Sequence, residues 1–126
     1  MPLRPPVTRA LTIIVATGDA ERLHAALTFA AASAAMGTET RVHLHEGAVA
    51  LMRDLRAPND GARTAAGLPT LAQIRGEAQD IGVKISVCQS GLALAGLTLE
   101  DFDERVEAQG PIGVLTIAGD DRLIVF

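Results

Sequence analysis

Short apolar runs alternate along the chain with longer stretches of helical spacing. Residues 11–16 (Leu-Thr-Ile-Ile-Val-Ala) form a β-branched run that is typical of a parallel strand covered on both faces. Apolar residues then recur at helical spacing between Asp19, a suitable N-cap, and Gly37, a suitable left-handed end. This pattern predicts a strand followed directly by a helix.

The same alternation continues through the middle of the chain. Residues 41–45 alternate polar and apolar side chains, which predicts a second strand at an edge of the sheet. A short helix is expected over residues 48–52, and the Pro, Asn and Gly residues of 53–67 indicate a long loop or lid. Pro69 suits the first position of the next helix, which Gly82 ends.

The third strand is predicted over residues 83–87, and it leads directly into Cys88 and a further short helix. The last part of the chain allows two interpretations. By propensity, residues 112–118 and 122–126 form a hairpin; alternatively, 112–118 is a helix between parallel strands near 105–109 and 122–126.

Strands that alternate with helices predict a parallel sheet with right-handed crossovers. We expect the first strand to lie between the second and the third, which creates a switch point. The loops at 17–19 and 88–90 then flank one crevice at the carboxyl ends of the strands, where open α/β sheets bind ligands. Residues 10–126 are expected to form one α/β domain after a flexible lead-in over residues 1–9, which lacks the features of a signal peptide.

Composition narrows the class of protein. Hydrophobic residues make up 48% of the 126 residues, yet there is no Trp or Tyr and there are only three Phe, so the core should consist of small aliphatic side chains. A net charge of −4 argues against a nucleic-acid partner, and no apolar run has the length of a membrane span. A single cysteine forms no intrachain disulfide, which favours a reducing compartment such as the cytoplasm.

Cys88, the only cysteine, is the best candidate reactive group. It falls where a strand passes into a helix, and the N–H groups at a helix start favour the nucleophilic thiolate. Ser90 and the amides of Gln89 to Gly91 are candidates to bind an anionic sulfur group. The alternative is an inert, buried thiol that serves as a small hydrophobic side chain.

Other candidate binding residues surround the same expected crevice. His43 and His45 share one strand face, and His45 and Glu46 should lie near the carboxyl edge, where a histidine can shuttle a proton for a thiol. Two exposed histidines of an edge strand are the simpler interpretation, and a metal site using both with Cys88 is the weakest. Thr17 and Gly18 form either an anion-binding turn or a plain turn, since no dinucleotide or P-loop glycine pattern is present.

Several segments together resemble one family. The sequence Cys-Gln-Ser-Gly-Leu-Ala-Leu-Ala-Gly-Leu at 88–97 resembles the cysteine segment of the DsrE/DsrF-like family of sulfur-relay proteins. The order of the other matching segments agrees with this resemblance, which covers nearly the whole chain after residue 10. Those segments are 13–17, 43–47, 67–71 leading to 81–85, and 121–126.

The resemblance implies a flavodoxin-like, three-layer α/β/α fold with a mostly parallel sheet of about five strands, and self-association into homo-oligomers. It favours the helix over residues 112–118. It also implies that Cys88 accepts sulfane sulfur from a donor protein and passes it to an acceptor protein. We expect neither a cofactor nor a metal. Because the chain has no second cysteine, an internal disulfide cannot release the sulfur.

The sequence therefore predicts a small cytoplasmic sulfur carrier, a possible sulfurtransferase, that uses Cys88. The alternative is a non-catalytic oligomeric scaffold or small-ligand-binding module with the same fold. Cys88 would then be buried and slow to react, and its replacement would mainly disturb packing.

Overall fold

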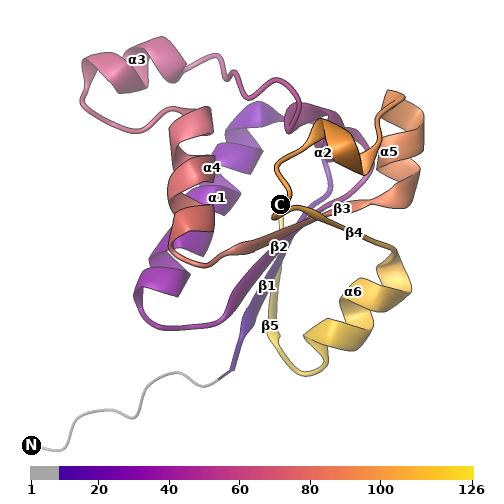
Figure 1. Cartoon of the computed structure of the whole chain (residues 1–126). Helices are drawn as coiled ribbons and strands as arrows, with labels where there is room; N and C mark the ends of the chain where they lie inside the picture. Colours follow the sequence, from indigo (N-terminus) through magenta and orange to yellow (C-terminus); the bar gives the residue numbers. More distant parts are fainter. Residues whose placement is uncertain (1–8) are drawn as a thin grey trace, which may run out of the picture.

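Five parallel strands form a single sheet in the computed structural model, which describes residues 9–126 (Figure 1). The strand order is β4-β3-β2-β1-β5. Residues 1–8 of the expected lead-in lie outside the described residues. The strands are β1 (Leu11–Val15), β2 (Thr40–Leu44), β3 (Lys84–Cys88), β4 (Glu107–Gln109) and β5 (Arg122–Val125).

Helices cover both faces of the sheet, which confirms the predicted three-layer α/β fold. Helices α1 and α4 pack together on one face, whereas α6 lies on the other (Figure 1). Among the described helices, none combines the length and the apolar character needed to cross a membrane. The helices are α1 (Ala20–Ala35), α2 (Gly47–Leu51), α3 (Asp60–Ala65), α4 (Leu71–Asp80), α5 (Gln89–Ala95) and α6 (Pro111–Ala118), with a 3₁₀ turn η1 (Leu99–Asp101).

The predicted order of the first three strands was wrong. Strand β2, not β1, lies between its two neighbours: Val42 is in register with Ile13 of β1 and with Ile85 of β3. Strand β2 is therefore no edge strand. Its polar residues face a second covered surface, where the buried His43 contacts Ser86 through a 2.8 Å hydrogen bond. The strand order reverses between β1 and β5, so Cys88, at the end of β3, lies away from the switch point.

The last part of the chain follows the alternative that the family resemblance favoured. Helix α6 begins at Pro111, whose fixed φ and missing N–H suit a first helical position. Strand β5 then pairs in parallel with β1, with Ile124 in register with Ile13. The hairpin interpretation was wrong. Strand propensity at 112–118 is a local property, whereas the parallel pairing of β5 with β1 depends on contacts between distant parts of the chain.

Local signals predicted most of the helix ends. Asp19 is the N-cap of α1, and Gly37 follows that helix with a φ of 84°. Helix α4 starts later than expected, because Thr70 is its N-cap and forms a capping box with Gln73. Pro69 therefore lies outside the helix rather than at its first position.

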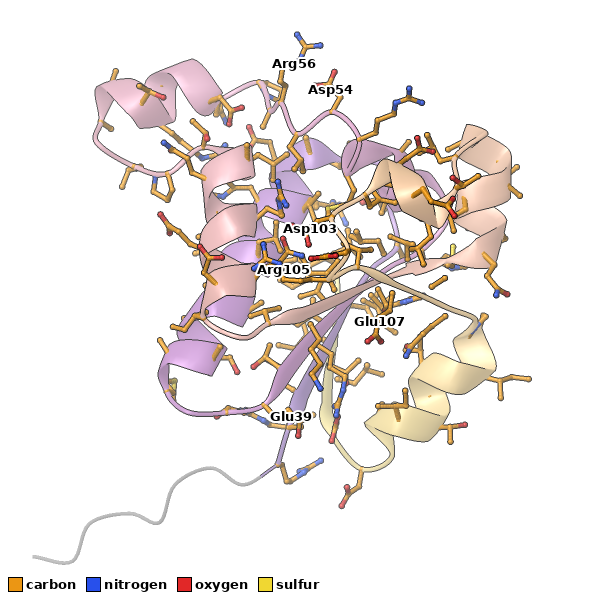
Figure 2. The ribbon with its side chains drawn as sticks, viewed as in Figure 1. Glu39, Asp54, Arg56, Asp103, Arg105 and Glu107 are labelled. Atoms are coloured by element: carbon orange, nitrogen blue, oxygen red, sulfur yellow. The ribbon has the colours of Figure 1, made fainter. Side chains whose placement is uncertain are left out.

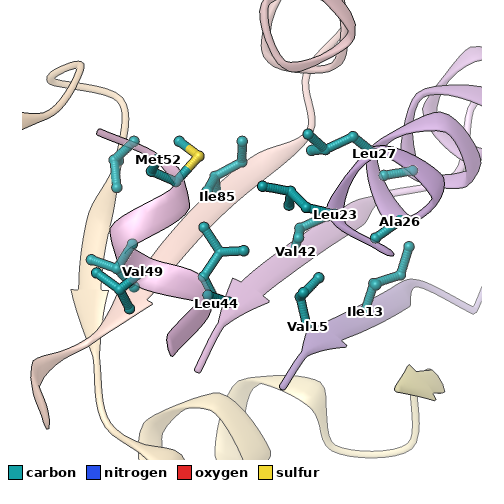
Figure 3. Close-up of a cluster of buried hydrophobic side chains, with 14 of the residues drawn as sticks. Ile13, Val15, Leu23, Ala26, Leu27, Val42, Leu44, Val49, Met52 and Ile85 are labelled. Carbon is teal, nitrogen blue, oxygen red and sulfur yellow. The ribbon is translucent and has the colours of Figure 1, made fainter. Parts of the chain in front are cut away.

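Small aliphatic side chains fill the core between the sheet and α1, as the composition predicted (Figure 3). Ile13 and Val42 are fully buried against Leu23 and Leu27 of α1. Phe29, on the same helix, is largely exposed. Close packing of small groups therefore stabilises this fold without a buried aromatic cluster.

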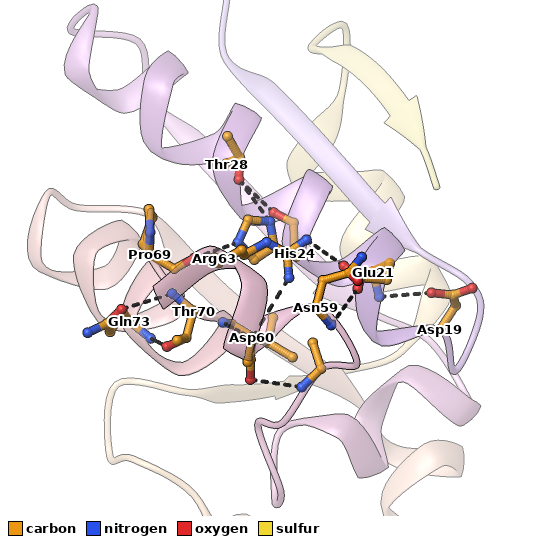
Figure 4. Close-up of polar contacts among 12 residues, drawn as sticks. Asp19, Glu21, His24, Thr28, Asn59, Asp60, Arg63, Pro69, Thr70 and Gln73 are labelled. Atoms are coloured by element: carbon orange, nitrogen blue, oxygen red, sulfur yellow. Dashed lines mark hydrogen bonds and ion pairs between the residues drawn. The ribbon is translucent and has the colours of Figure 1, made fainter. Parts of the chain in front are cut away.

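Residues 53–67 are not the loose segment that the sequence predicted, because they contain α3. Figure 4 shows the polar contacts that join this helix to its neighbours. Arg63 forms an ion pair with Glu21 of α1, and Asp60 accepts a 3.0 Å hydrogen bond from the backbone N–H of Leu71. The segment is thus attached to α1 and α4.

The turn before β4 is held by a second polar cluster (Figure 2). Arg105 donates hydrogen bonds to Asp103 and to Asp80 at the end of α4. The hydrogen bonds from Arg105 hold the pKa of Asp103 down to about 2. These contacts fix the approach to β4, the strand beside β3 and its terminal cysteine.

Candidate functional site

Cys88 ends β3 and is also the N-cap of α5, so one residue belongs to both elements. Its backbone is extended, with φ −78° and ψ 146°, and its Sγ accepts a hydrogen bond from the backbone N–H of Gly91 at 3.1 Å. Only 1% of the residue is exposed. Because helix α5 has only seven residues, the N–H group of Gly91 contributes more than the helix dipole to the electrostatic environment of the sulfur.

A second backbone donor reaches the sulfur from the end of β2. The N–H of Glu46 lies 2.9 Å from Sγ of Cys88. Glu46 has φ 49° and ψ −117°, in a region that favours glycine and costs about 1–3 kcal/mol for other residues. The surrounding packing therefore maintains a strained residue at the point where its N–H contacts the cysteine.

The side chains of Ser90 and Glu46 form the outer part of the site. The hydroxyl of Ser90 lies 3.5 Å from Sγ of Cys88 and 3.0 Å from Oε1 of Glu46. With one proton, this hydroxyl donates to one of the two at a time. When Ser90 donates to the sulfur, a Cys88 thiolate accepts three hydrogen bonds. When Ser90 donates to Glu46 instead, its oxygen can accept a hydrogen bond from the Cys88 thiol.

The fit around the sulfur depends on the absence of a side chain at residue 91. A Cβ atom built on Gly91 would lie 2.3 Å from Cγ2 of Val49, 2.8 Å from the carbonyl oxygen of Glu46 and 2.9 Å from Sγ of Cys88. Such distances are shorter than van der Waals contact. Glycine therefore allows α5 to approach α2 closely enough for both backbone N–H groups to reach one sulfur atom.

The turn after β1 packs against the segment that contains Glu46 and does not contact the sulfur directly. A Cβ on Gly18 would lie 3.2 Å from the carbonyl oxygen of Gly47, the residue that follows Glu46. The hydroxyl of Thr17 is buried without a hydrogen-bond partner. Because β2 separates β1 from β3, this turn packs beside the Glu46 segment rather than opposite Cys88, and the crevice predicted between the two loops was wrong.

The structure thus brings Cys88, Glu46 and Ser90 together and leaves two other predicted residues outside the group. Gln89 is exposed at the first position of α5, next to Cys88 in sequence, but the sulfur receives its hydrogen bonds from other residues. His45 lines a cavity together with His43 and residues of α6. Across residues 9–126, no three His, Cys, Asp or Glu side chains cluster closely enough to form a metal-binding group.

One functional group of the site was missed by sequence reasoning, namely the backbone N–H of Glu46. The sequence pointed to Glu46 only through its expected position near the carboxyl edge of the sheet. The positive φ that accompanies its backbone contact has no signal in the sequence, because glutamate is disfavoured in that conformation.

Burial in the sheet face beneath α6 lowers the pKa of His43 to about 4, with a smaller contribution from the charge of His45. His43 is 4% exposed, and in the unfolded chain its pKa returns to about 6.5. The unfolded state therefore binds more protons between those two values, so acid favours unfolding in that window.

We expect the free energy of unfolding to fall by up to about 3 kcal/mol as the pH drops from 6.5 to 4, and to be insensitive to this residue outside that window. Urea unfolding at a series of pH values measures the effect. In His43→Gln, stability should be nearly flat over the same range. If the free energy of unfolding of this variant fell with pH as steeply as that of the natural protein, groups other than His43 would be responsible.

The fold and the site define a small α/β protein with an open parallel sheet. Its buried cysteine lies at the carboxyl edge of that sheet and accepts two backbone hydrogen bonds. The chain belongs to the DsrE/DsrF-like family, whose sequence model matches residues 9–126. This match confirms the resemblance that the cysteine segment indicated.

Solved structures show the same fold. The chain is similar to the ychN protein from E. coli, with a TM-score of 0.74 and 17% identity over 94% of this chain and 100% of that one. It is also similar to BT1422 from Bacteroides thetaiotaomicron, described as a conserved protein of unknown function, with a TM-score of 0.68 and 14% identity over 94% and 95% of the two chains.

A third solved structure has the same fold. This is MTH1491 from Methanobacterium thermoautotrophicum, described as a protein of unknown function, with a TM-score of 0.63 and 16% identity over 94% of this chain and 99% of that one. Identities this low establish a shared fold. Comparison with curated protein sequences finds no significant match.

Proposed function

We propose that the protein is a sulfur carrier that holds a sulfane sulfur atom as a persulfide on Cys88. The observation that carries this proposal is the convergence of three donors on one sulfur atom: the N–H groups of Glu46 and Gly91 and the hydroxyl of Ser90. Hydrogen bonds from N–H groups stabilise a negative charge more than a neutral thiol. An inert packing thiol needs no such arrangement.

The proposed transfer is a thiol–persulfide exchange. The Cys88 thiolate attacks the outer sulfur of a donor persulfide, R–S–SH; the donor S–S bond breaks, a new S–S bond forms on Cys88, and the donor leaves as a thiolate that takes up a proton. An acceptor thiolate then attacks the same outer sulfur and releases the Cys88 thiolate. Sulfur moves without net oxidation, so a single cysteine is sufficient.

Ser90 and Glu46 provide the path for the proton in this proposal. A Cys88 thiol can donate to the oxygen of Ser90 while the Ser90 hydroxyl donates to the carboxylate of Glu46, 3.0 Å away. A proton leaving the sulfur then passes to the surface through an exposed hydroxyl. Ser90 therefore both positions the thiol proton and stabilises the thiolate that remains.

Intact-protein mass spectrometry tests the proposal. After incubation with glutathione persulfide and removal of the reagent, the protein should gain the mass of one sulfur atom, and Cys88→Ser should gain none. If the natural protein gains no sulfur, or if the gain persists in Cys88→Ser, the proposal is overturned.

Replacement of Ser90 by alanine should slow the loading of sulfur about tenfold, the effect of losing roughly 1.4 kcal/mol of hydrogen bonding. Stability should hardly change, because Ser90 is exposed. The rate is measured by sampling the same mass-spectrometric reaction over time. Gln89→Ala, at the adjacent exposed position, is the matched control and should load at the natural rate; equal slowing in both variants would contradict the proposed role of Ser90.

The burial of Cys88 favours a second candidate function, a non-catalytic scaffold or ligand-binding module. With 1% of the residue exposed, a donor reaches the sulfur only when α5 or the Glu46 turn moves. The scaffold hypothesis expects slow modification of Cys88 by a thiol reagent and no dependence on Ser90. Sulfur loading that requires Ser90 separates the carrier from the scaffold.

The surface of α6 and β5 supports self-association with further copies of the chain. Helix α6 is apolar on nearly all sides, and its exposed residues include Ile112 (83%) and Leu115 (58%). Apolar helices of this kind are normally covered. We therefore propose a homo-oligomer joined through this surface, which acts with donor and acceptor proteins in the cytoplasm; sedimentation of Ile112→Lys at a smaller mass than the natural protein would support it.

A further inference from the structure

A cavity lies between α6 and the sheet, on the face opposite α1. Its volume is about 220 Å³, which exceeds the roughly 150 Å³ of an engineered apolar cavity that takes up benzene. Carbon atoms dominate its walls, and the two imidazoles are the polar side chains among the lining residues. These residues are Ile14, His43, His45, Pro111, Val114 and Leu115.

His43 in the wall of this cavity has an unmade hydrogen bond. Its Nδ1 lies 2.8 Å from the hydroxyl oxygen of Ser86, whereas its Nε2 is buried without a partner. A buried polar atom left without a partner costs about 1–3 kcal/mol. His43 as a whole is 4% exposed, so water does not replace the missing contact freely.

The protonation of His43 indicates which group would complete this hydrogen bond. Burial lowers the pKa of His43 to about 4, so the ring is neutral at about pH 7 and does not attract an anion. In a neutral ring one nitrogen donates and the other accepts, and Ser86 can take either role toward Nδ1. A hydroxyl group, which both donates and accepts, suits Nε2 in either tautomer.

We propose that the cavity beneath α6 binds a small, uncharged molecule of about one ring that carries a hydroxyl group, with the hydroxyl hydrogen-bonded to Nε2 of His43. The apolar side chains of Ile14, Val114 and Leu115 line the space that the hydrocarbon part of the ligand occupies. Cys88 is not among the residues that line this cavity, and binding there does not depend on sulfur transfer.

Titration with phenol, followed by two-dimensional amide NMR, tests the proposal, with toluene as the analogue that lacks the hydroxyl. Phenol should shift the amide signals of residues around the cavity and bind roughly three- to tenfold more tightly than toluene, the effect of one neutral hydrogen bond. In His43→Leu the two compounds should bind equally. In Leu115→Trp, altered at the exposed rim, neither should bind.

Equal binding of phenol and toluene to the natural protein would mean that the hydroxyl group makes no hydrogen bond in the cavity, and it would overturn the proposal. Shifts confined to the groove beside Phe29 and Met36 would also overturn it. So would failure of phenol to bind while the cavity signals change with protein concentration, because a second copy would then fill the space. If His43→Leu does not fold, Leu115→Trp and the toluene comparison still decide the outcome.

Discussion

Gly91→Ala is expected to destabilise the folded protein by about 2 kcal/mol and to stop sulfur loading on Cys88. The added methyl group meets the backbone oxygen of Glu46, at 2.8 Å, as well as the side chain of Val49. A side chain can rotate away, but a backbone carbonyl moves only with its chain. Relief therefore requires α5 to move from α2, which separates the sulfur from the N–H of Glu46.

Gly76→Ala is the matched control, because Gly76 also lies inside a helix, but beyond its chain neighbours and the nearby helix backbone no atom lies within 4 Å of its added Cβ. Alanine stabilises an open helical position by about 0.5–1 kcal/mol relative to glycine. Urea unfolding should therefore give opposite signs for the two variants, and only Gly91→Ala should lose sulfur loading. If Gly91→Ala were as stable and as active as Gly76→Ala, the close approach of α5 to α2 would have no part in the site.

Replacement of Cys88 should reveal whether its hydrogen bonds or its packing stabilise the fold. Cys88→Ala leaves the N–H groups of Glu46 and Gly91 without their acceptor and removes the N-cap of α5, so we expect a loss of about 3 kcal/mol. Cys88→Ser retains an acceptor, and serine is a good N-cap, so its loss should be about 1 kcal/mol.

A thiol that served only as a small hydrophobic group would give the opposite order, because alanine is apolar and serine would bury a hydroxyl. Urea unfolding of both variants measures the order directly. Greater stability of Cys88→Ala than of Cys88→Ser would contradict the view that the site is built around an accepting sulfur.

The sequence predicted the elements of this fold better than their arrangement in space. Local chemistry was sufficient for β1, for the N-cap at Asp19 and for the turn at Gly37, since each depends on a few neighbouring residues. The order of β1 and β2 depends on contacts between distant segments. His43 suggested an exposed edge strand, whereas its face is buried beneath α6 and bonded to Ser86.

The candidate site was predicted in the same uneven way. The position of Cys88 at a strand-to-helix junction was visible in the sequence, and so was the small residue Gly91 that follows it. The contact from the N–H of Glu46 was not, because it requires a backbone conformation that glutamate disfavours and a partner 42 residues away. Side-chain type indicated which residues take part, but backbone geometry determines what they do.

The most direct test of the carrier proposal follows one labelled sulfur atom through uptake and release. The protein is loaded from a persulfide donor that carries isotopically labelled sulfur, freed of the donor, and then mixed with a low-molecular-weight thiol. The proposal predicts that the label is found on the Cys88 peptide after loading, and that it passes to the added thiol as Cys88 returns to its original mass. Label that never reaches Cys88, or that remains there when the acceptor is added, would contradict it.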